Sequence, residues 1–240
     1  MRMKSVVPVL IPVYNPPDLF TDYFRAFRAG FTGPIIVVND GSHRRFTALF
    51  QEIGTLPDTT VLVHRKNKGK GAALKTAMRH VLNHVPGAPG SITVDADGQH
   101  TLADVLKLQK AALDMPQCLL VGSRRERARM PAKSRFGNAL TRVTLRLLHG
   151  YRVFDTQSGL RYVPKQLMTD CIQSVFDKYD FELDMLVRAG KARIAVSEIP
   201  IETIYINKNA SSHYKTLHDS AYVARVFWHH LTRPKIVQAR

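Results

Sequence analysis

The sequence is poor in cysteine and has no long apolar run. Only 2 of its 240 residues are cysteines, which excludes a fold held together by a disulfide network. No stretch approaches the roughly 18 consecutive apolar residues that a membrane-spanning helix needs. The apolar stretch at residues 6–13 contains prolines and is too short for a signal peptide. We therefore expect a cytoplasmic protein, either soluble or held peripherally on the cytoplasmic face of a membrane.

Acidic residues are scarce as well. The chain has 19 acidic and 35 basic side chains, which leaves a formal net charge of +16. Such a charge attracts anionic partners: nucleic acid, acidic lipid or phosphorylated substrates. A basic nucleic-acid-binding protein is the non-enzymatic alternative. Because no basic face interleaved with aromatic residues occurs outside residues 214–240, we expect no nucleic acid among the partners.

Short apolar runs alternate with helical patterns in the first half of the chain. The expected strands lie at residues 6–11, 34–38, 60–63, 91–94 and 119–122. The expected helices lie between them, at residues 19–29, 45–53, 71–83 and 103–113. This alternation predicts an α/β fold, with a Rossmann-like, mostly parallel sheet flanked by helices.

The pattern changes after residue 125. Helices are expected at residues 134–148, 165–176, 181–189 and 217–231, and a strand at residues 193–205. Since no linker, repeat or low-complexity tract interrupts the chain, we expect one domain over residues 1–240. It consists of a nucleotide-binding half (1–125), an acceptor half (126–213) and an amphipathic C-terminal helix (214–240).

Polar motifs follow all five expected strands of the first half. They occupy residues 12–15, 39–42, 67–71, 95–100 and 122–124. In open α/β sheets, ligands bind beyond the carboxyl ends of the strands. The coincidence therefore predicts one ligand site along this edge.

Asp95 and Asp97 come directly after the fourth expected strand. Two carboxylates this close repel each other when partly buried, and a hard divalent cation removes that penalty. Gln99 adds a neutral oxygen, and such donors suit Mg²⁺ or Mn²⁺ bridged to substrate phosphates. The alternative is an Asp-Gly turn before a helix that Thr101 caps. The position at a strand end favours the metal site.

The loops after the second and third strands favour a nucleotide. Asp40 can accept hydrogen bonds from a base edge or a ribose, and Gly41 permits a tight turn. Lys70 and Gly71 open a helix, where backbone N–H groups and positive side chains favour phosphate. The alternatives are a plain strand-to-helix turn and a structural helix cap. Neither a P-loop nor a dinucleotide fingerprint is present.

Residues 123–146 are strongly basic. Most of these side chains fit a solvated face, but Arg124 ends a strand on the ligand side, and an arginine fork matches phosphate oxygens. Further on, Asp155, Asp180 and Glu182 are candidates for a general base, with helix capping as the alternative for Asp180. No nucleophile triad and no zinc spacing occurs in the sequence.

Five motifs together resemble the family-2 glycosyltransferases of the GT-A fold. They are residues 11–15, 37–42, 67–73, 95–100 and 122–124. Within that family the chain is most similar to the dolichyl- and polyprenyl-phosphate sugar transferases. Residues 155–161, 179–182 and 198–201 carry that closer likeness.

The resemblance implies a metal-dependent, inverting transfer of a sugar from a nucleotide-diphosphate sugar to a polyprenyl or dolichyl phosphate. The implied nucleotide-binding residues are Pro12, Tyr14, Asn15, Asp40, Lys70, Gly71 and Asp95. The implied ligands of Mg²⁺ or Mn²⁺ are Asp95, Asp97 and Gln99. The implied catalytic residues are Asp97, Arg124 and Asp155. The implied acceptor and phosphate ligands are Arg124, Arg135 and Ser158.

The acceptor has two alternatives. A lipid phosphate is already anionic and needs no general base, whereas a glycan hydroxyl needs a carboxylate, for which Asp155 or Asp180 is the candidate. Pro16, Asn39 and Thr156 stand where the family commonly has Glu, Asp and Pro. These departures bear on the nucleotide base and the acceptor rather than on the reaction class.

The C-terminal helix also allows two interpretations. Its apolar residues, Trp228 among them, alternate with lysine and arginine. A basic amphipathic helix with a tryptophan can lie on an anionic membrane surface. The other interpretation is a helix whose apolar side packs on the core.

Overall fold

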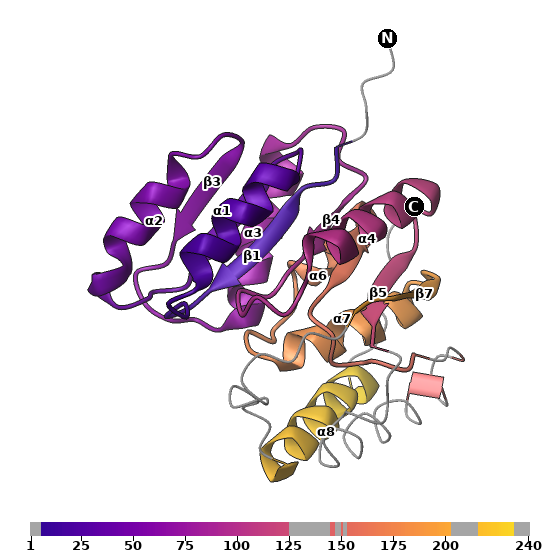
Figure 1. Ribbon diagram of the computed structural model, residues 1–240. Coiled ribbons are helices and arrows are strands. Elements are labelled where there is room, and N and C mark those ends of the chain that lie inside the picture. The colour runs from indigo at the N-terminus through magenta and orange to yellow at the C-terminus, as the bar shows by residue number, and fades with distance from the viewer. Residues whose placement is uncertain (1–5, 125–144, 147–149, 151–152, 203–215, 233–240) are drawn as a thin grey trace.

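The computed structural model describes residues 6–124, 145–146, 150, 153–202 and 216–232 (Figure 1). The strands are β1 (Val9–Val13), β2 (Ile35–Asn39), β3 (Thr59–Val63), β4 (Gly90–Thr93), β5 (Leu119–Ser123), β6 (Arg161–Pro164) and β7 (Val196–Pro200). The helices of the first half are α1 (Phe20–Gly30), the short 3₁₀ helix η1 (Arg44–Phe46), α2 (Thr47–Gly54), α3 (Lys70–His84) and α4 (Leu102–Asp114). Further along lie α6 (Lys165–Cys171), α7 (Asp180–Lys191) and α8 (Thr216–Thr232).

The described strands form one sheet in the order β3-β2-β1-β4-β6-β5-β7. β6 runs antiparallel to its neighbours β4 and β5, and the other pairs of neighbouring strands are parallel. The expected α/β class with a mostly parallel sheet is confirmed. No strand was expected at residues 161–164, so β6 and its antiparallel insertion between β4 and β5 were missed. Its four residues begin with a charged arginine and do not form an apolar run.

Helices cover both faces of the sheet (Figure 1), and β1 shows why its sequence is an unbroken apolar run. Successive side chains of a strand point to opposite faces. Leu10 packs into one core with Leu74 of α3, while Val9 packs into the other with Phe24 of α1. A strand buried on both sides needs apolar residues at every position.

Some expected boundaries were wrong beyond residue 125. The helix expected at 165–176 ends at Cys171, as α6. The strand expected at 193–205 is β7, and it begins only at Val196 because Arg193 adopts a left-handed turn with φ 56° after α7. The helix expected at 134–148 falls largely outside the described residues. The division of the chain into two halves and a C-terminal helix stays a prediction.

Helix α8 packs on α7 with one side and faces solvent with the other. Val226 and Phe227 are buried, whereas the side chains of Trp228 and Leu231 are 70% and 67% exposed. At its C-terminal end the Nε2 atom of His230 lies 2.5 Å from Oδ1 of the buried Asp184 on α7. No helix within the described ranges is long and apolar enough to cross a membrane.

Candidate active site

The direction of the strands brings the predicted motifs to one edge of the sheet. The loops that follow β1, β2, β4 and β5 leave from the same edge because these strands point the same way. Because β6 is antiparallel, the segment that precedes it, residues 155–160, arrives at that edge too. One physical link between the segments is the hydrogen bond from Thr93 Oγ1 to the carbonyl of Gly159, at 2.7 Å.

The loops after β1 and β2 are tied together by Asn15. This residue adopts a left-handed conformation with φ 46°, which asparagine tolerates better than most residues. Its N–H donates to Ser42 Oγ, and its Oδ1 accepts from the N–H of His43, both at 2.9 Å. Asn15 therefore orients the loop beside Tyr14, whose side chain is 53% exposed. Pro12 lies near the end of β1, opposite Val38 of β2.

Asp40 holds the loop that leads into α3. Its carboxylate is buried and accepts hydrogen bonds from the N–H groups of Lys68, at 3.0 Å, and Gly69, at 2.8 Å. The Nδ1 atom of His64 lies 2.6 Å from the same carboxylate. These contacts place Asp40 as the anchor between the second and third loops. Its proposed contact with the nucleoside stays a prediction.

Lys70, the first residue of α3, bridges two carboxylates. Its Nζ atom lies 2.5 Å from Oδ1 of Asp95 and 2.7 Å from Oε1 of Glu182 at the start of α7. Burial would lower the pKa of Lys70, but the two carboxylates raise it above its usual range. Burial would raise the pKa of Asp95, but Lys70 and His100 hold it well below its usual range. The ammonium and the Asp95 carboxylate are therefore both charged.

Two glycines allow the close approach of backbone that this bridge requires. A Cβ atom on Gly159 would lie 2.2 Å from Oδ2 of Asp95, so a side chain at this position would displace that carboxylate. A Cβ atom on Gly71 would lie 2.6 Å from Cβ of Phe181, so only glycine lets α3 start against α7. The structure therefore gives Gly71 a role in packing α3 against α7. Its predicted contact with a phosphate stays a prediction.

Asp97 and Gln99 form a turn beyond Asp95. Oδ1 of Asp97 accepts the N–H of Gln99 at 3.0 Å. Partial desolvation and the negative charge of Asp95 raise the pKa of Asp97. Within the described residues, no three His, Cys, Asp or Glu side chains could hold a metal ion together. The hard oxygens of Asp95, Asp97 and Gln99 fit Mg²⁺ or Mn²⁺, ions that take further ligands from substrate phosphates.

Arg124 and Asp155 form a forked ion pair at the end of β5. The Nε and Nη2 atoms of Arg124 lie 2.7 and 3.1 Å from the two oxygens of Asp155, which is buried. Oε1 of Glu198 in β7 accepts the N–H of Asp155 at 3.0 Å. The structure thus brings together Arg124 and Asp155, two of the residues predicted to be catalytic. It also pairs Asp155, a candidate general base, with a positively charged side chain.

The buried side chain of Arg161 holds the segment before β6, residues 155–160, a role that the sequence did not predict. Its guanidinium is fully buried and donates to the backbone carbonyls of Thr156, Ser158 and Glu182, at 2.8, 2.8 and 2.5 Å. The sequence feature that could have indicated this role is a charged arginine within an apolar stretch.

The buried Oγ of Ser158 and Nδ1 of His100 have no hydrogen-bond partner among the described residues. Both atoms can therefore still bond to a ligand or to water.

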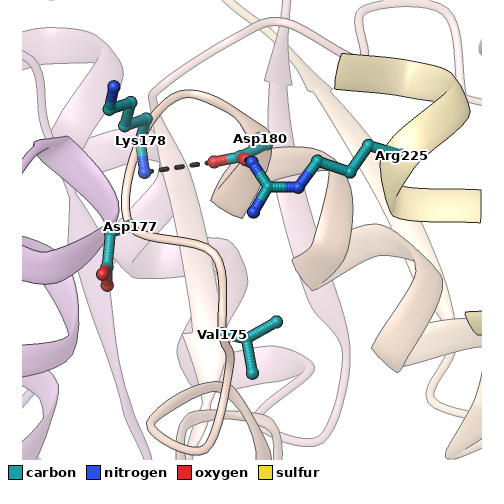
Figure 2. Close-up of a pocket in the computed structure, with 5 residues that line it drawn as sticks. All are labelled: Val175, Asp177, Lys178, Asp180 and Arg225. Carbon is teal, nitrogen blue, oxygen red and sulfur yellow. Dashed lines mark hydrogen bonds and ion pairs between the residues drawn. The ribbon is translucent and has the colours of Figure 1, made fainter. Parts of the chain in front are cut away.

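Asp180 is the first residue of α7. It lines a small cavity of about 210 Å³ with Val175, Asp177, Lys178 and Arg225 of α8 (Figure 2). Its Oδ1 accepts the N–H of Lys178, a residue that precedes α7, at 3.1 Å, and the N-cap of the helix is Tyr179 rather than Asp180. Its Oδ2 is 3.9 Å from Nη1 of Arg225. Arg135, expected to bind phosphate, lies outside the described residues.

A family model described as "Glycosyl transferase family 2" matches residues 9–162. A UDP-N-acetylglucosamine–dolichyl-phosphate N-acetylglucosaminyltransferase from Methanococcus voltae is 29% identical over 220 residues, which cover 84% of this chain and 86% of the relative. An uncharacterized protein from Methanocaldococcus jannaschii is 30% identical over 213 residues, covering 87% of this chain and 85% of that protein.

Solved structures share the fold at lower identity. The glucosyl-3-phosphoglycerate synthase of Mycobacterium tuberculosis, crystallised with Mn²⁺, UDP and phosphoglyceric acid, aligns with a TM-score of 0.66 at 15% identity, covering 97% of this chain and 80% of that one. The mannosyl-3-phosphoglycerate synthase of Rubrobacter xylanophilus aligns with the same TM-score of 0.66 at 16% identity, covering 98% and 78%.

Proposed function

This chain belongs to glycosyl transferase family 2 and is a glycosyltransferase, and on that premise we propose that it transfers a sugar from a nucleotide-diphosphate sugar to a polyprenyl phosphate. The transfer is metal-dependent and inverts the configuration at the anomeric carbon. Asp95, Asp97 and Gln99 hold the cation, and Arg124 contributes a fixed positive charge at the end of β5.

The pairing of the candidate bases supports a phosphate acceptor. Asp155 is paired with Arg124, Glu182 with Lys70, and Asp180 lies near Arg225. In each case a positively charged side chain already lies beside the carboxylate that would have to take the proton of a hydroxyl acceptor. A phosphate acceptor is already ionised and needs no base, whereas a hydroxyl acceptor does. The dolichyl-phosphate activity of the M. voltae relative agrees with this proposal.

The mechanism follows from charge. When bound, a divalent cation neutralises the diphosphate that leaves the sugar. Lys70 holds the carboxylate of Asp95, and the fork with Asp155 holds the guanidinium of Arg124, so both groups are oriented before the substrate arrives. The acceptor oxygen attacks the anomeric carbon from the face opposite to the diphosphate, and this single displacement inverts the configuration.

A matched pair of acceptors tests the proposal. The purified protein is incubated with Mn²⁺ and labelled UDP- or GDP-sugars, together with either a polyprenyl phosphate or the corresponding polyprenol. We expect label to enter the organic phase with the phosphate only, because the polyprenol has a hydroxyl and requires a base. Transfer to glycan hydroxyls, or to polyprenol as readily as to its phosphate, would contradict the proposed acceptor.

We also propose that the exposed side of α8 contacts an anionic membrane, where a polyprenyl phosphate would reside. Trp228 and Leu231 supply the apolar contact, and the net charge of +16 supplies attraction to acidic lipid. The test is flotation with liposomes containing anionic lipid. The double variant Trp228→Ser with Leu231→Ser should lose most of the binding, whereas Val63→Ser, an exposed apolar residue of β3, should keep it. Equal flotation of all three proteins would overturn the membrane contact.

A further inference from the structure

Lys70 lies where three segments of the chain meet at the proposed donor site: α3, the loop after β4 and α7. Its backbone begins α3, its ammonium contacts Asp95 after β4, and it also contacts Glu182 on α7. All three side chains are largely buried, with exposed fractions of 18%, 25% and 11%. A lysine so confined acts as a fixed charge rather than as a flexible surface group.

The charges of this cluster do not balance. One ammonium faces the two largely buried carboxylates of Asp95 and Glu182, and the exposed Asp97 lies two residues beyond Asp95. Two carboxylates that share one ammonium and are shielded from water destabilise each other. The cluster therefore keeps a net negative charge. Oδ1 of Asp95 is in contact with Lys70 Nζ, so a cation bound to Asp95 has to share this carboxylate with the ammonium.

We propose that Lys70 is an internal counter-ion of the donor site, which holds Asp95 in place when the divalent cation is absent and competes with that cation for the same carboxylate. Lys70 thereby sets the affinity of the site for the metal. This inference rests on the metal dependence of the proposed function. It assigns Lys70 to the carboxylates, in addition to the nucleotide contact expected from its motif.

The surroundings of Lys70 favour an exchange of partners over a large movement. The backbone at Glu182 is held because its carbonyl accepts from the buried Arg161, and the start of α3 is held because Gly71 packs directly on Phe181. When a cation takes Asp95, the ammonium keeps Glu182. A lysine has three N–H donors, so the donor that leaves Asp95 becomes available to a phosphate oxygen of the sugar nucleotide.

The direct test is a titration of the metal-free protein with Mn²⁺ alone, followed by electron paramagnetic resonance of the free ion. Lys70→Met removes the competing charge, and we expect its Mn²⁺ dissociation constant to fall about tenfold, which corresponds to about 1.4 kcal/mol. Lys68→Met is the matched control, because it removes a charge from an exposed lysine of the same loop. It should change the dissociation constant much less.

Each outcome has a distinct meaning. Unchanged or weaker Mn²⁺ binding by a folded Lys70→Met overturns the inference and leaves the proposed function standing. An equal gain in Lys68→Met also overturns it, since general charge would then be the cause. If no protein, wild type included, binds Mn²⁺, the metal role of the proposed function falls together with the inference.

A second variant separates the loss of charge from a folding defect in Lys70→Met. Lys70→Gln keeps a hydrogen-bonding group between the carboxylates but removes the charge, and it should also bind Mn²⁺ more tightly than the wild type. Circular dichroism verifies that each variant is folded. Lys70→Arg keeps the charge and should bind Mn²⁺ like the wild type; a gain as large as that of Lys70→Met would contradict competition by charge.

Discussion

The guanidinium of Arg124 holds the carboxylate of Asp155 by two hydrogen bonds, of 2.7 and 3.1 Å. Asp155 is only 1% exposed, and Glu198 accepts the N–H of the same residue. The end of β5, the segment before β6 and the strand β7 therefore meet at one ion pair. This contact joins the second half of the chain to the edge of the sheet where we propose the donor site.

Removing Arg124 should destabilise the protein as a whole. Arg124→Ala leaves Asp155 as a buried charge without its guanidinium, and such a loss costs about 3–5 kcal/mol. Urea unfolding measures the change in free energy. The control is Arg25→Ala, since the Arg25–Glu52 pair is exposed and surface pairs contribute about 0–1 kcal/mol. Equal losses in the two variants would show that the fork does not stabilise the fold.

Asp97 should be needed for turnover. Asp97→Ala removes one of the two carboxylates that we assign to the cation, and we expect kcat/KM to fall by at least about 100-fold. The thermal stability should change little, because Asp97 is exposed. The sugar-transfer assay with saturating Mn²⁺ measures the effect. Turnover equal to that of the wild type would remove Asp97 from the site.

Gly159 should tolerate no side chain. In Gly159→Ala the new Cβ would lie 2.2 Å from Oδ2 of Asp95, so the carboxylate must shift away from Lys70. We expect a loss of stability of about 1–3 kcal/mol and a clear loss of activity. Gly54→Ala at the end of α2 is the control, because its Cβ would make an ordinary contact of 3.4 Å with Val61. If both variants behave alike, the crowding at Asp95 has no consequence.

The contact between α7 and α8 should weaken in acid. Burial raises the pKa of Asp184, but the hydrogen bond from His230 and the charge of Arg188 outweigh it, so the pKa lies below its usual range. A carboxyl group with a lowered pKa in the folded state stabilises the protein above its unfolded pKa of about 3.9. That stability is lost as the pH falls below about 3.9 toward the folded pKa.

Thermal unfolding at a series of pH values measures this effect. Asp184→Asn cannot ionise, so its melting temperature should be lower at neutral pH and should depend less on pH below about 4. Asp22→Asn, at an exposed aspartate in the first turn of α1, should keep the wild-type pH profile. A profile of Asp184→Asn that parallels the wild type would contradict the assignment.

The strand ends were the most predictable part of the molecule. Runs such as residues 34–38 are apolar at every position because both faces of the sheet are covered. The polar motif that follows each run places its residues beyond the carboxyl end of that strand. Asp95, Asp97 and Arg124 were found there for this reason. The family and the fold class that these motifs implied are confirmed by the comparisons.

The partners of the charged residues were not predictable from local pattern. Nothing near Lys70 in the sequence indicates Glu182, because only the packing of α3 against α7 brings them together. The same holds for Asp40, which the motif assigned to a nucleoside and which the structure shows binding the loop before α3. Spacing along the chain identifies the type of a residue and the edge where it lies, while long-range packing decides its neighbours.

The placement of β6 has a consequence for how the chain reaches its folded form. The two neighbours of β5 in the sheet, β6 and β7, both come later in the chain. Until they have been synthesised, β5 has no strand to pair with and one edge of β4 is open, and open edges invite association with other chains. Pairings between distant segments also slow folding. A nascent chain of this enzyme is therefore most exposed to aggregation between the emergence of β5 and that of β7, the period in which a chaperone would be of most use.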